Sequence, residues 1–154
     1  MKRSLGLMLC LVTTAVPIES QATDSARQIA ESNVAQWNAA FAKGNMDGIL
    51  ALYADNALLV QPNGSVAKGA GEIREFWQSL IGQGAYAMDI VDVRSEQDGS
   101  IIATARLSDI KTLRSEQPQT IKYHYGGVLY SVLRRQPDGS WKAQVQRWSA
   151  GRGI

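Results

Sequence analysis

The stretch that decides the fold is residues 37–62, which read WNAAFAKGNMDGILALYADNALLVQP. Gly44 is typical of the position just past a helix end, because glycine readily adopts the left-handed backbone found there. Asn45 can then cap a second, short helix, whose apolar side chains are Met46, Ile49, Leu50 and Tyr53. The run at 57–61 reads as a buried strand, which Pro62, Asn63 and Gly64 close with a turn. This stretch therefore predicts a helix end, a short helix, a strand and a turn in succession.

Two longer helices flank this stretch. Upstream, Asp24 and Ser25 precede a helical pattern whose apolar residues recur every three or four positions, namely Ala26, Ala30, Val34, Trp37 and Phe41. Downstream, a helix after Gly69 places four apolar residues on one face, namely Ile73, Phe76, Trp77 and Leu80. Because each helix has one apolar face, we expect both to pack against a common core.

From Ala85 onward the apolar residues recur with the period of a strand. Asp98-Gly99 is a hairpin signal before a second strand at 100–109. A long strand at 120–135 contains Gly126-Gly127, which predicts a bulge or a sharp bend. A last strand follows at 140–149. Helices followed by an antiparallel meander predict an α+β fold. We expect a cone-shaped roll, in which a curved, mostly antiparallel sheet and three N-terminal helices enclose a cavity.

Residues 1–22 have the features of a secretory signal peptide. Lys2 and Arg3 give a charged start, and a short apolar run follows at 5–16. Ser20-Gln21-Ala22 then offers small residues at the −3 and −1 positions of a cleavage site. The apolar run is too short to span a bilayer, so we expect no membrane span.

These features predict cleavage after Ala22, a periplasmic or secreted location, and one domain at 23–154. Cys10 suggests lipid attachment as an alternative, but Leu9 stands where a small residue is wanted. An intact mass that begins at Thr23 would confirm the cleavage, whereas a retained leader or a lipid mass on Cys10 would contradict it.

Composition excludes several classes of protein. The chain has 154 residues, of which 45% are hydrophobic and 19% charged, as in a folded globular domain. One cysteine and one histidine exclude a disulfide framework, a cysteine-rich zinc site and a His-rich metal centre. The net charge of +2 is too small to indicate nucleic-acid binding. We therefore expect no metal and no cofactor, and a small molecule or a protein as partner.

The stretch at 37–62, continued to Phe76-Trp77, resembles the nuclear transport factor 2-like superfamily, and most of all its SnoaL-like and ketosteroid-isomerase-like branch. The resemblance rests on the order of several short motifs, namely Gly44, Asp47-Gly48, Tyr53-Ala54-Asp55, the Pro62 turn, Gly69, Phe76-Trp77, Asp138-Gly139-Ser140-Trp141-Lys142 and Trp148-Ser149. It covers most of residues 26–149 and implies the cone-shaped fold. It implies no single activity, because this superfold hosts isomerases, dehydratases, hydrolases, cyclases and non-enzymes.

The resemblance also implies where a ketosteroid isomerase would hold its catalytic residues. The aspartate base sits just before the turn proline, and this position is Gln61 here. The oxyanion-hole tyrosine position matches Trp37, and the protonated aspartate position falls at Ser131. A glutamine cannot abstract a proton near neutral pH, so we expect no isomerase chemistry of that kind.

We expect a cavity that binds a small, neutral, mostly apolar molecule carrying one or two hydrogen-bonding groups. Its mouth would be lined by Trp37, Tyr53 and Trp77, and its polar wall by Gln61, Ser131, Gln144, Gln146 and Trp148. The wall assumes that Gln144, Gln146 and Trp148 share the inner face of the last strand. The alternative is that Trp141, Ala143 and Val145 face inward instead.

Two function classes remain open. The first is a small-molecule protein, either a divergent isomerase, lyase or hydrolase or a non-catalytic binder. The second is a protein-interaction module that uses the outer face of the sheet, where Tyr123, Tyr125, Tyr130 and Val132 could supply an apolar interface. In either class we expect a homodimer formed through this outer face. A filled interior would favour the second class. His124 has no carboxylate nearby in the sequence to orient it, so we interpret it as structural.

Overall fold

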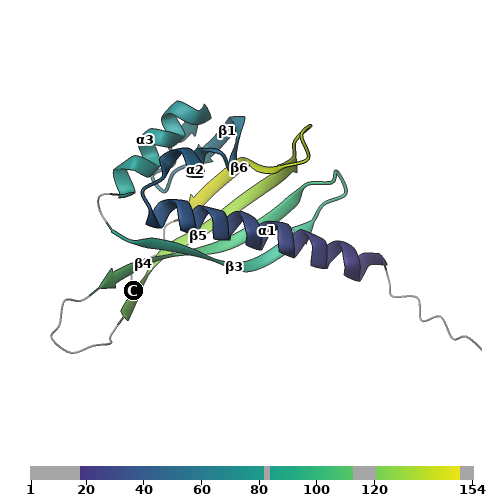
Figure 1. Cartoon of the computed structure of the whole chain (residues 1–154), viewed down its shortest axis with the longest axis horizontal. Helices are drawn as coiled ribbons and strands as arrows, with labels where there is room; N and C mark the ends of the chain where they lie inside the picture. Colours follow the sequence, from purple (N-terminus) through teal and green to yellow (C-terminus); the bar gives the residue numbers. More distant parts are fainter. Residues whose placement is uncertain (1–17, 82–83, 113–120, 150–154) are drawn as a thin grey trace, which may run out of the picture.

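The computed structural model describes residues 18–81, 84–112 and 121–149. Its three helices are α1 (Ile18–Ala42), α2 (Met46–Leu50) and α3 (Gly69–Ile81). Its six strands are β1 (Tyr53–Val60), β2 (Val66–Lys68), β3 (Tyr86–Ser95), β4 (Ile101–Thr112), β5 (Ile121–Arg135) and β6 (Trp141–Ser149). The predicted α+β class and the three helices before the meander are confirmed (Figure 1).

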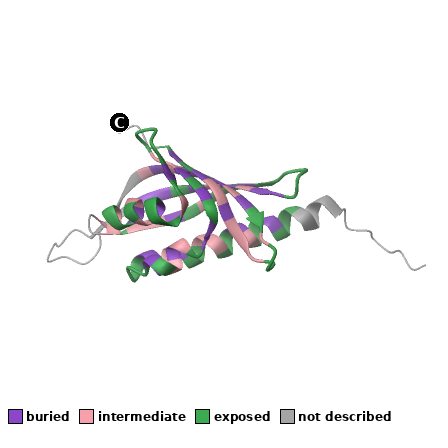
Figure 2. Cartoon of the chain, turned by 90° about the horizontal axis from the view of Figure 1, so that it is seen from above, coloured by how far each residue is buried: buried purple, intermediate pink, exposed green. Residues whose placement is uncertain are grey.

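All six strands form one curved sheet in the order β2-β1-β6-β5-β4-β3. Neighbouring strands are antiparallel except β1 and β6, which run parallel. This pairing places the stretch that opens the fold beside the last strand of the chain. Figure 2 shows α1 lying along one face of the sheet, with buried residues on both elements.

Helix α1 packs on β3 through the predicted apolar face, of which Ala26, Ala30, Trp37 and Phe41 are buried. One asparagine fixes how the helix lies. The Asn38 side chain donates to the Met88 carbonyl over 2.9 Å and accepts from the Met88 N–H over 2.8 Å. Because both groups of the carboxamide are used, α1 is held to one position along β3.

The boundary around Tyr53 differs from the prediction. Asn45 caps α2 as expected, since its side chain accepts from the Gly48 N–H over 3.0 Å. Tyr53, however, is the first residue of β1 and not the end of α2. The reason is tertiary, because the Leu52 carbonyl accepts from the Ala143 N–H over 2.8 Å and draws the chain into the sheet early. Two further boundaries also differ, since α1 begins earlier, at Ile18, and the short strand β2 was not predicted.

Strand β5 contains the bulge that its glycine pair predicts. The register changes from Leu107 opposite Gly127 to Ser108 opposite Tyr125, which leaves Gly126 as the extra residue. A side chain there would collide with the backbone, because a Cβ on Gly126 would lie 2.9 Å from the Leu107 oxygen.

Among the residues described, no helix is long and apolar enough to cross a membrane.

The bulge gives a stability prediction. Gly126→Ala should lower the free energy of unfolding by about 1–3 kcal/mol, because β4 and β5 must separate to admit the methyl group. Urea denaturation measures this. Gly71→Ala is the matched control, since Gly71 lies in α3 with nothing near its Cβ. That change should be neutral or stabilising by up to about 1 kcal/mol. Equal effects of the two substitutions would contradict the bulge geometry.

Candidate functional site

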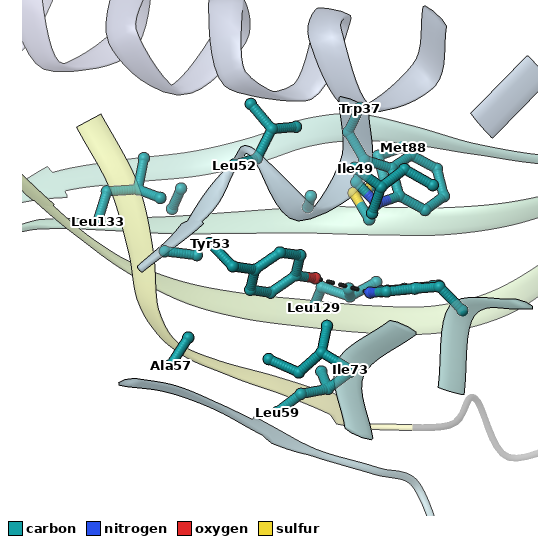
Figure 3. Packing of buried hydrophobic residues seen from close by; sticks show 14 of the residues in the cluster. Trp37, Ile49, Leu52, Tyr53, Ala57, Leu59, Ile73, Met88, Leu129 and Leu133 are labelled. Atoms are coloured by element: carbon teal, nitrogen blue, oxygen red, sulfur yellow. Dashed lines mark hydrogen bonds between the residues drawn. The ribbon is translucent and has the colours of Figure 1, made fainter. Parts of the chain in front are cut away.

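A chain of hydrogen bonds crosses the otherwise apolar interior between the helices and the sheet. The Tyr53 hydroxyl accepts from the Trp77 indole N–H over 2.9 Å, drawn as a dashed line in Figure 3. The same hydroxyl donates to the Gln146 side-chain oxygen over 2.5 Å. The Gln146 amide nitrogen then donates to the Ser131 hydroxyl over 2.8 Å. All four residues are buried, and we call them the Tyr53 network.

Strand pairing positions the network. Ser131 on β5 lies directly opposite Gln146 on β6, so both side chains project from the same face. Tyr53 opens β1, which runs beside β6, and Trp77 reaches it from α3. The network therefore joins β5, β6, β1 and α3, elements that are far apart in sequence.

Burial makes Tyr53 a neutral donor. Loss of solvent raises the pKa of the Tyr53 phenol well above its ordinary value, and the hydrogen bond from Trp77 offsets only part of this. The phenol therefore stays protonated at neutral pH, so it can donate a hydrogen bond but cannot act as a base.

Beside the network lies a cavity of about 20 Å³, which is room for about one water molecule. Its lining comprises Ala30, Asn33, Val34, Trp37, Leu52, Tyr53, Met88, Ile90, Ala103, Ala105, Ser131, Leu133, Ala143 and Gln146. None of these described residues carries a charge at neutral pH. The volume is far below the roughly 300–1,000 Å³ of ordinary ligand pockets, so the interior as it stands is nearly filled.

One polar atom of this lining is unpaired. The Trp37 indole N–H is buried and has no hydrogen-bond partner among the described residues. The Trp37 ring is held firmly, since it stacks on Phe41 at 4.7 Å between ring centroids and meets the edge of Trp77 at 5.1 Å. A buried donor without a hydrogen-bond partner lowers the stability of the fold by roughly 1–3 kcal/mol. Among the described lining residues, the Trp37 N–H is the buried side-chain donor in this situation.

The structure brings together four of the eight residues that the sequence suggested for the site. Trp37, Tyr53, Ser131 and Gln146 line the cavity. Trp77 and Trp148 lie in the adjoining aromatic cluster, where their rings stack at 6.3 Å. Trp148 donates its indole N–H to the Gly126 carbonyl over 2.7 Å.

Gln61 and Gln144 do not line the cavity. Gln61 lies half-buried at the turn after β1, where its backbone N–H donates to Ser65. Gln144 is turned away by a bulge, because the register passes from Val132 opposite Val145 to Leu133 opposite Ala143. Its side chain donates instead to the Asn56 side chain over 2.9 Å. The inner face of β6 therefore carries Ala143, Gln146 and Trp148, a mixture of the two patterns considered from the sequence.

Sequence reasoning missed Asn33, although it stands one helical turn before Trp37 and so shares its face. Asn33 and Leu52 also line a wider groove of about 400 Å³, which we call the α1–β6 groove. The other residues of this groove are Ser25, Gln28, Ile29, Ser32, Gln36, Ala51, Ser140, Trp141 and Lys142. Cavity and groove thus meet at two shared side chains.

Among the described residues, no group of three or more His, Cys, Asp or Glu side chains could hold a metal ion. The side chain of His124 lies outside the described residues, as do those of Tyr123 and Tyr125.

Comparisons with known proteins agree with this geometry. The family model of the SnoaL-like domain matches residues 34–143. A ketosteroid isomerase-like protein from Erwinia carotovora atroseptica SCRI1043 has a similar structure, with 18% identity and a TM-score of 0.61 over 82% of this chain and 96% of that chain. ActVI-ORFA from Streptomyces coelicolor is similar with 13% identity and a TM-score of 0.65, over 82% and 97% of the two chains.

An NTF-2 like protein of unknown function from Shewanella oneidensis MR-1 is similar with 15% identity and a TM-score of 0.62, over 80% of this chain and 98% of that chain. No curated protein matches the chain. At these identities the likenesses show the fold alone.

The Tyr53 network predicts a large effect from one oxygen atom. Tyr53→Phe should lower the free energy of unfolding by about 2–4 kcal/mol, because the Trp77 donor and the Gln146 acceptor both lose their partner in a buried site. Tyr130→Phe is the control, since Tyr130 is 47% exposed. It should change stability by less than about 0.5 kcal/mol. Similar urea midpoints for the two variants would rule out a structural role of the network.

Burial of the phenol also predicts a dependence on alkaline pH. In the unfolded chain Tyr53 ionises near pH 10, whereas in the folded protein its pKa is higher. The stability that this difference contributes is complete below about pH 10 and is lost as the pH rises toward the folded-state pKa. Wild type should therefore lose up to about 1.4 kcal/mol per pH unit more than Tyr53→Phe above that point. Parallel stability curves for the two proteins would contradict a buried, neutral Tyr53.

Proposed function

Because the chain belongs to the SnoaL-like domain family, we propose that it binds a small, neutral, largely apolar molecule between α1 and the inner face of the sheet. One observation carries this proposal. The Trp37 indole N–H is buried and has no partner among the described residues, and Trp37 is one of the residues that line the cavity. A hydrogen-bond acceptor on a ligand would satisfy it.

The cavity lining indicates the chemical class of the ligand. An ion would need an opposite charge in this low-dielectric interior, and the described lining residues offer none. A ketone, ether or ester oxygen can accept from Trp37 without that requirement. Alanine, valine, leucine and methionine side chains supply apolar contact for the rest of such a molecule.

Binding requires the interior to open. A cavity of about 20 Å³ admits one water-sized group, so a larger ligand must displace side chains. Leu52 and Asn33 line both this cavity and the α1–β6 groove, which is open to solvent. We therefore propose that the ligand enters past these two side chains.

A reaction at this site would need a base from elsewhere. The family resemblance implies that Gln61 stands where ketosteroid isomerases hold their aspartate base, and Gln61 lies outside the cavity lining. Within the lining the phenol of Tyr53 is neutral and already donates to Gln146. These features support ligand binding over proton abstraction. An isomerase, lyase or hydrolase activity would draw its base from residues beyond the described lining.

An NMR titration that monitors the Trp37 indole N–H tests this proposal. Cyclohexanone, a small neutral ketone, is titrated into nitrogen-15-labelled protein while the four tryptophan indole N–H signals are recorded. The Trp37 signal should move downfield and saturate, as a new hydrogen bond requires. Methylenecyclohexane, which replaces the oxygen by a CH₂ group, should leave it in place.

A pair of variants separates binding from folding. Trp37→Phe removes an unpaired donor, so it should weaken ketone binding roughly five-fold, the worth of about 1 kcal/mol. Trp77→Phe instead removes a donor that is already bonded to Tyr53, and should lower stability more than Trp37→Phe does. Equal affinities of the ketone for Trp37→Phe and for wild type would contradict the proposal.

A second candidate function is pairing through the outer face of the sheet, and two observations favour it. The interior is nearly filled. The outer face also carries an apolar row across four strands, because Ile102 pairs with Val132, Val132 with Val145, and Val145 with Leu58. Leu58 is 37% exposed, and Tyr130 beside the row is exposed too. No described helix covers this face, so we propose a homodimer formed there.

Light scattering tests this pairing at tens of micromolar protein, a typical range for such affinities. Wild type should have the mass of a dimer. Val132→Glu should have the mass of a monomer, because it places a charge in the centre of the apolar row. Asp89→Asn, on the exposed part of edge strand β3, is the control and should remain dimeric. A monomeric wild type would exclude the interface.

A further inference from the structure

The α1–β6 groove holds side chains that do not line the interior cavity. Trp141 is the clearest of them. The other three tryptophans are buried and stack on aromatic neighbours. Trp141 is only half-buried, and its ring pairs with none of the aromatic rings described. It lines the α1–β6 groove and also a second hollow of about 240 Å³.

Helix α1 faces this indole with a neutral polar stripe. Its members are Ser25, Gln28, Ser32 and Gln36, spaced by three or four residues and hence on one side of the helix. Gln36 donates to the Ser32 hydroxyl over 3.2 Å. The Gln28 carboxamide makes no hydrogen bond to any described residue, so its donors and acceptor remain available to a ligand.

The charge of the groove narrows the class of ligand. Lys142 is the only charged residue of its lining. The pKa of Asp138 is lowered mainly by hydrogen bonds from Ser140, and the charge of Lys142 adds to this effect. An anion would find one cationic side chain, the half-buried Lys142, and a cation would find no carboxylate in the lining. A purely apolar ligand would remove water from the carboxamides of Gln28 and Gln36 without replacing their hydrogen bonds. A neutral molecule that is rich in hydroxyl groups meets all of these constraints.

We propose that the α1–β6 groove binds a neutral saccharide. One C–H face of a sugar ring lies against the Trp141 indole, and the sugar hydroxyls hydrogen-bond to Gln28 and Gln36 across the groove. The groove volume of about 400 Å³ falls within the range of ligand pockets. This site is separate from the interior cavity and goes beyond the function proposed for it.

The experiment is an NMR titration of the nitrogen-15-labelled protein with four neutral sugars, namely glucose, maltose, cellobiose and chitobiose. Each is titrated to about ten millimolar, where weak sites saturate. At least one probe should shift the Trp141 indole N–H and the side-chain amide signals of Gln28 and Gln36. The indole signal of Trp37 should stay in place, which distinguishes this site from the interior one.

Variants locate the binding. Trp141→Ala should weaken the responding probe about tenfold or more, as loss of an aromatic contact surface predicts. Because Trp141 also packs against the core, Gln28→Leu gives a second variant at an exposed helix position, with an expected loss of several-fold. Asp89→Asn changes an exposed side chain on edge strand β3, outside the groove lining, and should bind the sugar like wild type.

Three results would overturn the proposal. The first is that no probe moves the Trp141 signal. The second is that the affinity survives both Trp141→Ala and Gln28→Leu. The third is that sodium sulfate shifts the same signals as strongly as the sugars do, which would assign the groove to an anion held by Lys142. None of these results bears on the ketone titration of Trp37, so the two proposals fail independently.

Discussion

The buried hydroxyl of Tyr53 is the contact on which the interior of this protein depends. It lies where the chain leaves α2 and enters β1, and it connects a donor on α3 with an acceptor on β6. Gln146 extends the connection to Ser131 on β5. A buried polar group without a partner is costly, so the four side chains hold one another in place. A slip of β1 against β6 by one residue would turn the phenol to the other face and break the network.

Much of the fold was predictable because its signals are local. The apolar face of α1, the cap at Asn45 and the bulge at Gly126 are all marked by the residues themselves. The start of β1 was not predictable, because the parallel partner that pairs with it is β6, far away in the sequence. The residues of the candidate site likewise include some whose orientation the sequence predicts and one whose orientation it does not. Strand alternation places Gln146 and Trp148 inward, but it fails at Gln144, where a bulge without any glycine reverses the face.

The interior cavity and the α1–β6 groove differ in size and in the polarity of their linings, so they suit different ligands. The cavity beside the Tyr53 network is small, uncharged and apolar except for a few directed groups. The α1–β6 groove is larger and offers carboxamides, hydroxyls and one indole face to solvent. Both share Asn33 and Leu52, so a molecule in the groove would lie against the entrance of the cavity. Apart from Lys142 in the groove, the lining residues of both sites carry no charge, which favours recognition by shape and hydrogen bonding.

The unpaired indole of Trp37 is the observation that links the fold to ligand binding, and a crystal structure with cyclohexanone bound tests it most directly. Electron density for the ketone should lie in the cavity between α1 and the sheet, with its oxygen about 2.9 Å from Trp37 Nε1. Leu52 or Asn33, which line both the cavity and the groove, should have moved. Ketone density only outside the cavity, with Trp37 Nε1 bonded to a group of the protein itself, would contradict it.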